Sequence, residues 1–177
     1  MAVVIKPLSP PDSHHLLAAQ GWLELGNHAE ANEELKRIAP EFRAHPDVLD
    51  VRWHLCAHSE NWDDCLRLSE MVVHLAPERA DGWIHRSFAL HEMKRTQEAL
   101  DLLSPMARKF PAVWTIPYNL ACYCAQLGHM ARCKMWFEAA LAIDERTVKR
   151  AAAEDPDLKP LRTMLGPAFW KRKMDTP

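Results

Sequence analysis

The sequence predicts an all-α protein, and three observations lead to this prediction. Glycine is sparse at 5 residues, and a β-branched run typical of a strand occurs only at Val3–Ile5. Leucine and alanine recur elsewhere at the spacing of one helix face. Several residue types also repeat every 34 positions. The chain has 177 residues, which suffices for one compact domain or a short repeat array.

The repeat is seen most clearly in two series of residues that share the same phase. One consists of small residues at steps of 34: Ala31, Cys65, Ala99 and Cys133. The other is apolar throughout: Ile38, Val72, Met106 and Ala140. A fixed period of this length is typical of stacked helical hairpins.

In this phase the chain divides into four units, and each is predicted to form two helices of about 14 residues joined by a short turn. Pro77 and Pro111 are predicted to end second helices, because proline lacks a backbone donor and clashes with the preceding turn. The four predicted units are residues 12–45, 46–79, 80–113 and 114–147.

The turns between paired helices contain residues suited to helix ends. Gly26 and Gly128 are predicted to adopt the left-handed conformation that ends a first helix. Asn27 and Asn61 are predicted to cap second helices by accepting from free N–H groups.

These residues together resemble the tetratricopeptide repeat family, whose pattern is W-x2-L-G-x2-Y followed by a small residue, an aromatic residue and a closing proline. The resemblance covers about residues 12–147 and is strongest in the last two units. The third unit has Trp83, Leu90, Ala99, Leu103 and Pro111. The fourth has Leu120, Ala121, Gly128, Cys133, Phe137 and Ala140. The resemblance implies a right-handed α-α superhelix of about four hairpins.

The second unit departs from the family pattern. Arg52 and Trp53 stand where the family usually has leucine and glycine. Because a tryptophan at the second position would separate the paired helices, we expect that pair to be splayed or shifted in register.

The two ends of the chain lie outside the repeats. Residues 1–11 are predicted to be extended or disordered. Residues 148–177 are predicted to form short helices that cap the last repeat, because the end of a solenoid exposes an apolar face. Trp170 is predicted to begin a loose basic tail.

The resemblance implies a non-catalytic module that binds a protein or peptide partner in the groove lined by the first helix of each unit. Apolar anchors would supply affinity and polar side chains would fix the register. Asn119, in the stretch Tyr118-Asn119-Leu120, is the most specific candidate, since an asparagine there bonds the ligand main chain in peptide-binding members. The candidate partner-binding residues are Leu16, Gln20, Glu24, Asp50, His54, His58, Ile84, Phe88, His91, Tyr118, Asn119, Cys122 and Gln126.

The charged residues of this face indicate the ligand. Asp50 and Glu24 would repel an acidic peptide tail, so we expect neutral or weakly basic partner sequences. Arg52 and Arg86 occupy equivalent places in adjacent units. They are expected to form ion pairs with Asp50, Glu92 or neighbouring acids; the alternative is that they grip a carboxylate or phosphate.

Composition argues against several other classes of protein. The formal net charge is −2, which disfavours nucleic-acid binding. No apolar run approaches the length that crosses a bilayer, and no secretory signal is recognisable, so no membrane association is expected. An odd count of 5 cysteines favours buried thiols in a reducing cytoplasm. No cofactor or metal is predicted.

Two alternatives remain open. A self-assembling adaptor would form dimers through the exposed end face or through Val3–Ile5. A metal- or thiol-dependent enzyme would use His54, His58 and Cys122, because the two histidines are four positions apart, a spacing that metal ligands on one helix share.

Overall fold

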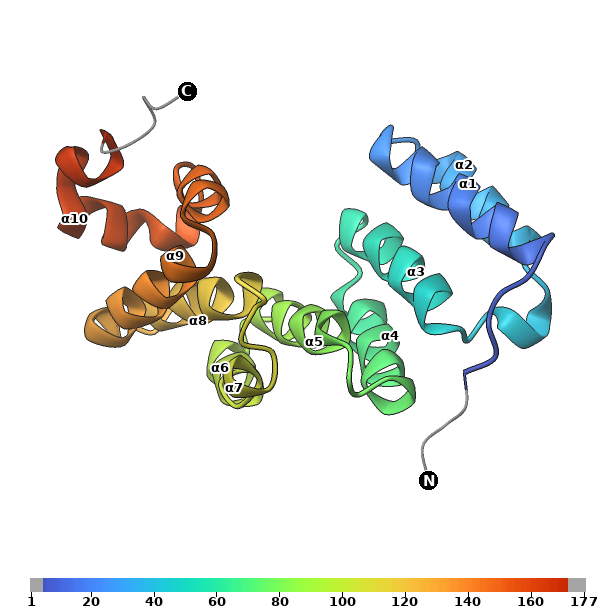
Figure 1. Ribbon diagram of the computed structural model, residues 1–177, viewed down its shortest axis with the longest axis horizontal. Helices are drawn as coiled ribbons and strands as arrows, with labels where there is room; N and C mark the ends of the chain where they lie inside the picture. Colours follow the sequence, from blue (N-terminus) through green and yellow to red (C-terminus); the bar gives the residue numbers. More distant parts are fainter. Residues whose placement is uncertain (1–4, 172–177) are drawn as a thin grey trace. The chain divides into compact units, whose positions relative to one another are not determined.

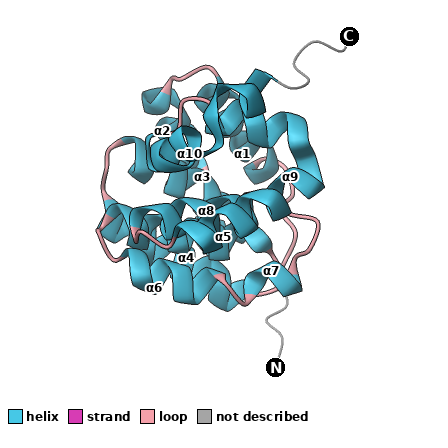
Figure 2. Ribbon diagram, turned by 90° about the vertical axis from the view of Figure 1, so that its left-hand side faces the viewer, coloured by secondary structure: helices cyan, strands magenta, loops and turns pink. Residues whose placement is uncertain are grey.

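The computed structural model describes residues 5–171, apart from the side chains of residues 167, 168 and 171. Within this part of the chain every regular element is a helix, as Figure 2 shows. The predicted all-α fold class is therefore confirmed. The chain forms two compact units, Met1–Ala89 and Leu90–Pro177, and the boundary falls inside one helix.

The N-terminal unit contains two helical hairpins, in which α1 packs on α2 and α3 packs on α4 (Figure 1). The first residues of a further helix, α5, complete this unit. Its elements are α1 (Asp12–Glu24), α2 (His28–Arg37), the 3-10 helix η1 (Pro40–Phe42), α3 (Pro46–His58), α4 (Trp62–Leu75) and α5 (Ala80–Glu92) as far as Ala89.

The C-terminal unit begins at Leu90 and is built around the hairpin of α8 and α9. The 3-10 helix η2 also packs on α8, and α10 packs on α9. After the end of α5, its elements are α6 (Thr96–Leu103), α7 (Met106–Lys109), α8 (Thr115–Gln126), α9 (Met130–Ala152), η2 (Pro156–Leu158) and α10 (Lys159–Lys171).

The same turn recurs every 34 residues. Gly26 and Gly128 have φ of 73° and 75°, which confirms their predicted left-handed conformation. Glu60 and Lys94 take the equivalent positions with φ of 53° and 64°, although neither is glycine. In each turn the following N–H donates to the carbonyl five residues earlier, as Asn27 N does to Trp22 O at 2.8 Å. This bond closes the helix end and reverses the chain.

The predicted asparagine caps are also confirmed. Asn27 Oδ1 accepts from Glu30 N at 3.2 Å, and Asn61 Oδ1 accepts from Asp64 N at 3.3 Å. Each cap satisfies a backbone donor that the first turn of a helix leaves free.

The small-residue series lies in the cores. Ala31, Cys65, Ala99 and Cys133 are all fully buried. In the N-terminal unit, one cluster of buried residues includes Leu16, Leu35, Ile38 and Val48. In the C-terminal unit the largest fully buried side chains are Tyr123, Phe137, Leu100, Leu103, Ile116, Leu120, Leu158 and Leu161.

Two local predictions were wrong. The second helix of the third unit is not continuous, because α6 ends at Leu103 and α7 begins at Met106 after Pro105, which lacks an N–H to donate. Trp53 does not splay its hairpin, since Cys65 Sγ on α4 approaches Trp53 O on α3 to 3.7 Å. The indole ring stacks on a side chain of α5 instead.

One glycine fixes how closely α5 approaches α4. A Cβ atom added at Gly82 would lie 2.8 Å from Val72 Cγ1. Only glycine therefore allows this contact, which places the first turns of α5 beside α4.

The chain ends differ in part from the predictions. Residues 5–9 have no regular structure, and Leu8 packs against the first core cluster. Trp170 does not begin a loose tail but lies in α10, with its ring 5.8 Å from that of Phe137. Residues 1–4 and 172–177, on which the rest of the predicted tail and most of the Val3–Ile5 segment fall, lie outside the described residues.

Candidate functional site

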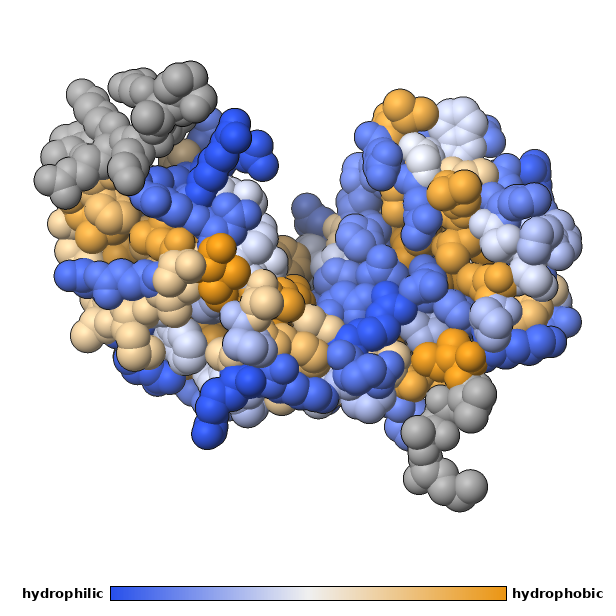
Figure 3. Space-filling model, in the orientation of Figure 1, coloured by the Kyte–Doolittle hydropathy of each residue, from blue (hydrophilic) through white to orange (hydrophobic). Residues whose placement is uncertain are grey.

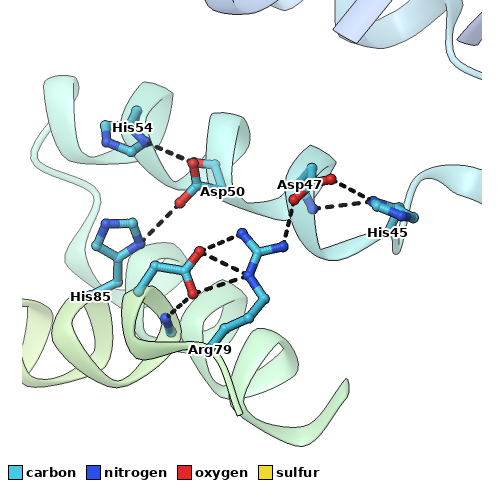
Figure 4. Close-up of polar contacts among 8 residues, drawn as sticks. His45, Asp47, Asp50, His54, Arg79 and His85 are labelled. Carbon is cyan, nitrogen blue, oxygen red and sulfur yellow. Dashed lines mark hydrogen bonds and ion pairs between the residues drawn. The ribbon is translucent and has the colours of Figure 1, made fainter. Parts of the chain in front are cut away.

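A polar network joins the start of α3 to the start of α5 in the N-terminal unit (Figure 4). Arg79, between α4 and α5, bonds the carboxylates of both Asp47 and Asp81. Asp81 Oδ1 also accepts from Gly82 N at 2.8 Å. His45 Nδ1 accepts from Asp47 N at 3.2 Å and so caps α3. The network fixes α5 against α3.

Asp50 and two histidines extend this network toward the C-terminal end of α3 (Figure 4). His85 Nδ1 lies 3.4 Å from Asp50 Oδ1, and His54 Nδ1 lies 2.9 Å from Asp50 O. Burial, with a smaller contribution from nearby His54, lowers the pKa of His85 to about 4. Burial also raises the pKa of Asp50 above its usual value. His85 is therefore neutral at physiological pH.

Aromatic rings pack around these groups. The rings of Trp53 and His85 stack with centroids 3.9 Å apart and an angle of 6° between their planes. Phe88 meets Trp53 edge-on at 6.1 Å and Trp62 at 5.8 Å. Trp53 is only 7% exposed. These ring contacts hold α5 against α3 and α4.

The predicted groove residues of the N-terminal unit are mostly accessible. Gln20, Glu24, His54 and His58 are exposed. Asp50, Ile84 and Phe88 are partly buried, and the ring of Phe88 also packs among the neighbouring aromatic rings. The ring of His58 stacks on that of His28 at 3.5 Å. Figure 3 shows hydrophilic and hydrophobic residues mixed over the surface.

One predicted groove residue of this unit was wrongly placed. Leu16 is 7% exposed and belongs to the buried core of α1, α2 and α3. Its neighbours there include Leu35 and Val48, so it stabilises the first hairpin and cannot contact a partner.

In the C-terminal unit, the chain's own segment Asp155–Asp157 covers several predicted groove residues. Tyr118 OH donates to Asp155 Oδ2 at 2.6 Å, and His91 Nε2 lies 3.0 Å from Asp157 Oδ2. Cys122 also contacts Asp155, and Gln126 Nε2 lies 3.4 Å from Asp157 O. Tyr118, Cys122 and His91 are buried in consequence, while Asn119 is partly buried and Gln126 is exposed.

The same segment contributes to the group of residues that most resembles a metal site. Within the described part of the chain, the ligand atoms of Cys122, Asp155 and Asp157 lie within 4.8 Å of one another. Burial raises the pKa of the Cys122 thiol, and the two carboxylates raise it further. Burial, together with Asp155, raises the pKa of Tyr118 as well. The thiol and phenol therefore stay protonated, and the group is a hydrogen-bonded network.

The two equivalent arginines differ in their partners. Arg86 Nη2 bonds Glu70 Oε1 at 2.9 Å, so its expected ion pair forms with a neighbouring acid rather than with Asp50 or Glu92. Arg52 makes no hydrogen bond or ion pair to any residue in the described part of the chain. The expected ion pair is thus absent at Arg52.

Known structures with this arrangement of hairpins include TTC0263, a thermophilic TPR protein from Thermus thermophilus. The two share 17% identity over 90% of this chain and 85% of that chain, with a TM-score of 0.75. The chain has the tetratricopeptide-repeat fold. MamA from Desulfovibrio magneticus RS-1 matches this tetratricopeptide-repeat chain at 16% identity over 96% of it and 100% of that chain, with a TM-score of 0.69. No protein-family model matches the sequence, and no curated protein does.

The site contains groups that sequence reasoning did not select. Trp53 was not among the predicted binding residues, and the Asp155–Asp157 segment was assigned only to a cap. The signal that could have drawn attention to Trp53 was a tryptophan at a position where the repeat pattern has glycine.

None of the helices among residues 5–171 has the length and apolar character needed to cross a membrane.

Proposed function

We propose that the protein is a non-catalytic interaction module that binds an extended or helical peptide on the N-terminal unit, at the surface formed by Gln20, Glu24, His54 and His58, the open surface. One observation carries this proposal: these four predicted residues are exposed, while three of their counterparts in the C-terminal unit are buried by the chain's own segment. A partner can contact the first set without displacing any part of the chain.

The chemistry of the open surface favours a neutral or weakly basic peptide. Glu24 is an exposed carboxylate, and Asp50 lies one helical turn before His54. The imidazoles offer hydrogen bonds, and the partly buried side chain of Ile84 offers apolar contact. Asn119 in the C-terminal unit makes no hydrogen bond through its side chain within the described part of the chain, so its amide remains a second candidate contact.

Affinity capture with matched variants tests the proposal. The immobilised protein and three variants are exposed to extract from the cells that make the protein. The first variant combines Gln20→Ala with His54→Ala on the open surface, the second is Asn119→Ala, and the third combines Glu33→Ala with Lys36→Ala on α2. Glu33 and Lys36 pair with each other at an exposed site, so their joint removal leaves neither charge unpaired. We expect the open-surface variant to recover about fivefold less of the partner, the cost of losing one important contact.

The α2 variant is expected to recover the partner as well as the unmodified protein does. Equal recovery by the open-surface variant would contradict the proposal, and a loss confined to Asn119→Ala would move the binding site to the C-terminal unit. Self-assembly is tested by light scattering, since a dimer that the open-surface variant dissociates would identify a second copy as the partner.

A further inference from the structure

A pocket of about 500 Å³ lies among α2, α3 and α4 of the N-terminal unit, apart from the open surface. Leu55, Leu68 and Met71 supply its apolar lining. Arg52 and Arg67, together with one carboxylate, supply its charges. Met71 is 42% exposed, so the pocket opens to solvent at this side.

The charges of the pocket are not balanced within the protein. Arg67 is neutralised by Asp64, to which it is bonded. Arg52 has no carboxylate partner among the described residues. The charged group that acts on it is another arginine, Arg43, whose own bonds go to the neutral carbonyls Ile38 O at 3.0 Å and Lys36 O at 3.1 Å. The pocket therefore has one uncompensated positive charge.

This imbalance is costly for a partly buried side chain. Burial lowers the pKa of Arg52, and Arg43 lowers it further, yet a guanidinium stays charged at physiological pH. A buried charge without a partner destabilises a protein unless something compensates it. Arg86, at the same position of the next repeat, has such compensation in Glu70. An anion from outside the chain would supply the compensating negative charge to Arg52.

The lining indicates which anion fits. Because Arg67 and Asp64 pair with each other, one net positive charge remains in the pocket, on Arg52, and it matches a single negative charge better than a dianion such as phosphate. The leucine and methionine side chains would gain nothing from a small hydrated ion, but they can bury an aliphatic group.

We propose that this pocket binds a monocarboxylate attached to an aliphatic body, with the carboxylate on Arg52 and the aliphatic body against Leu55, Leu68 and Met71. A fatty acid and the C-terminal residue of a peptide share this chemistry. The pocket is separate from the open surface, so the two proposals stand or fall independently.

Titration of the full chain with octanoate, followed by NMR of the methyl groups, tests the proposal. We expect saturable shifts at Leu55, Leu68 and Met71, and affinity about tenfold weaker in Arg52→Met, as for loss of one charge-assisted hydrogen bond. Arg86→Met is the matched control and is expected to bind octanoate unchanged. Arg52→Lys keeps the charge without the planar fork and is expected to bind with intermediate affinity, which provides a second test if Arg52→Met does not fold.

Three further probes sharpen the result. Octanol has the same aliphatic body without the charge, and inorganic phosphate has charge without the body; both are expected to bind more weakly than octanoate. A peptide ending in leucine, compared with its C-terminal amide, separates a peptide source from a fatty acid. Equal binding of octanol and octanoate, stronger binding of phosphate, or failure of both the fatty acid and the free peptide to bind would overturn the proposal.

Discussion

Trp53→Ala is expected to lower the free energy of unfolding by about 3–5 kcal/mol, the usual cost of deleting a large buried aromatic side chain. The indole ring is 7% exposed, stacks on His85 and contacts Phe88, so its loss opens a cavity between α3 and α5. Urea unfolding followed by circular dichroism measures the change.

Trp53→Phe is the matched control. It keeps an aromatic ring and removes the indole N–H, which is buried without a hydrogen-bond partner. We expect Trp53→Phe to lower the free energy of unfolding clearly less than Trp53→Ala does. The variant loses some ring area, but it also removes a buried donor that has no hydrogen-bond partner. A cost at Trp53→Ala no larger than that of an exposed substitution would show that the ring does not hold α5 in place.

Leu158→Ala is expected to lower the free energy of unfolding by about 2–5 kcal/mol, as for other fully buried leucines. Leu158 is 0% exposed and ends η2, directly after the two aspartates that contact α8 and His91. Loss of its side chain would loosen the segment that covers Tyr118 and Cys122. Urea unfolding again supplies the measurement.

Met164→Ala on α10 is the control for this variant. Met164 is 49% exposed, so its substitution is expected to change stability by no more than about 0.5 kcal/mol. If both variants had the same small effect, η2 would not be an integral part of the C-terminal unit.

The period of 34 residues predicted the repeat fold because it reflects local chemistry. Each hairpin turn needs a left-handed residue and a cap, and glycine and asparagine at Gly26, Asn27 and Gly128 supply these directly. Glu60 and Lys94 take the same conformation without a glycine. The fixed phase of the small core residues, rather than the turn residues alone, therefore predicts these two turns.

The candidate site was less predictable, because it depends on contacts between residues far apart in the sequence. Trp53 was expected to separate α3 from α4, but its ring stacks on His85 of α5. Tyr118 and Cys122 have the spacing of groove residues, yet Asp155 reaches them from 37 and 33 residues away. A helical pattern gives the face on which a residue lies but not which other segment covers that face.

The proposed function depends on one difference between the units: Gln20, Glu24, His54 and His58 are open in the N-terminal unit, whereas their counterparts His91, Tyr118 and Cys122 are covered in the C-terminal unit. Chemical modification of histidine by diethyl pyrocarbonate, read residue by residue by mass spectrometry, tests it directly. His54 has 48% of its side chain exposed and His91 has 9%, held against Asp157. We expect His91 to react about tenfold more slowly than His54 in the folded protein, and at the same rate in denaturant. Equal rates in the folded protein would contradict the claim.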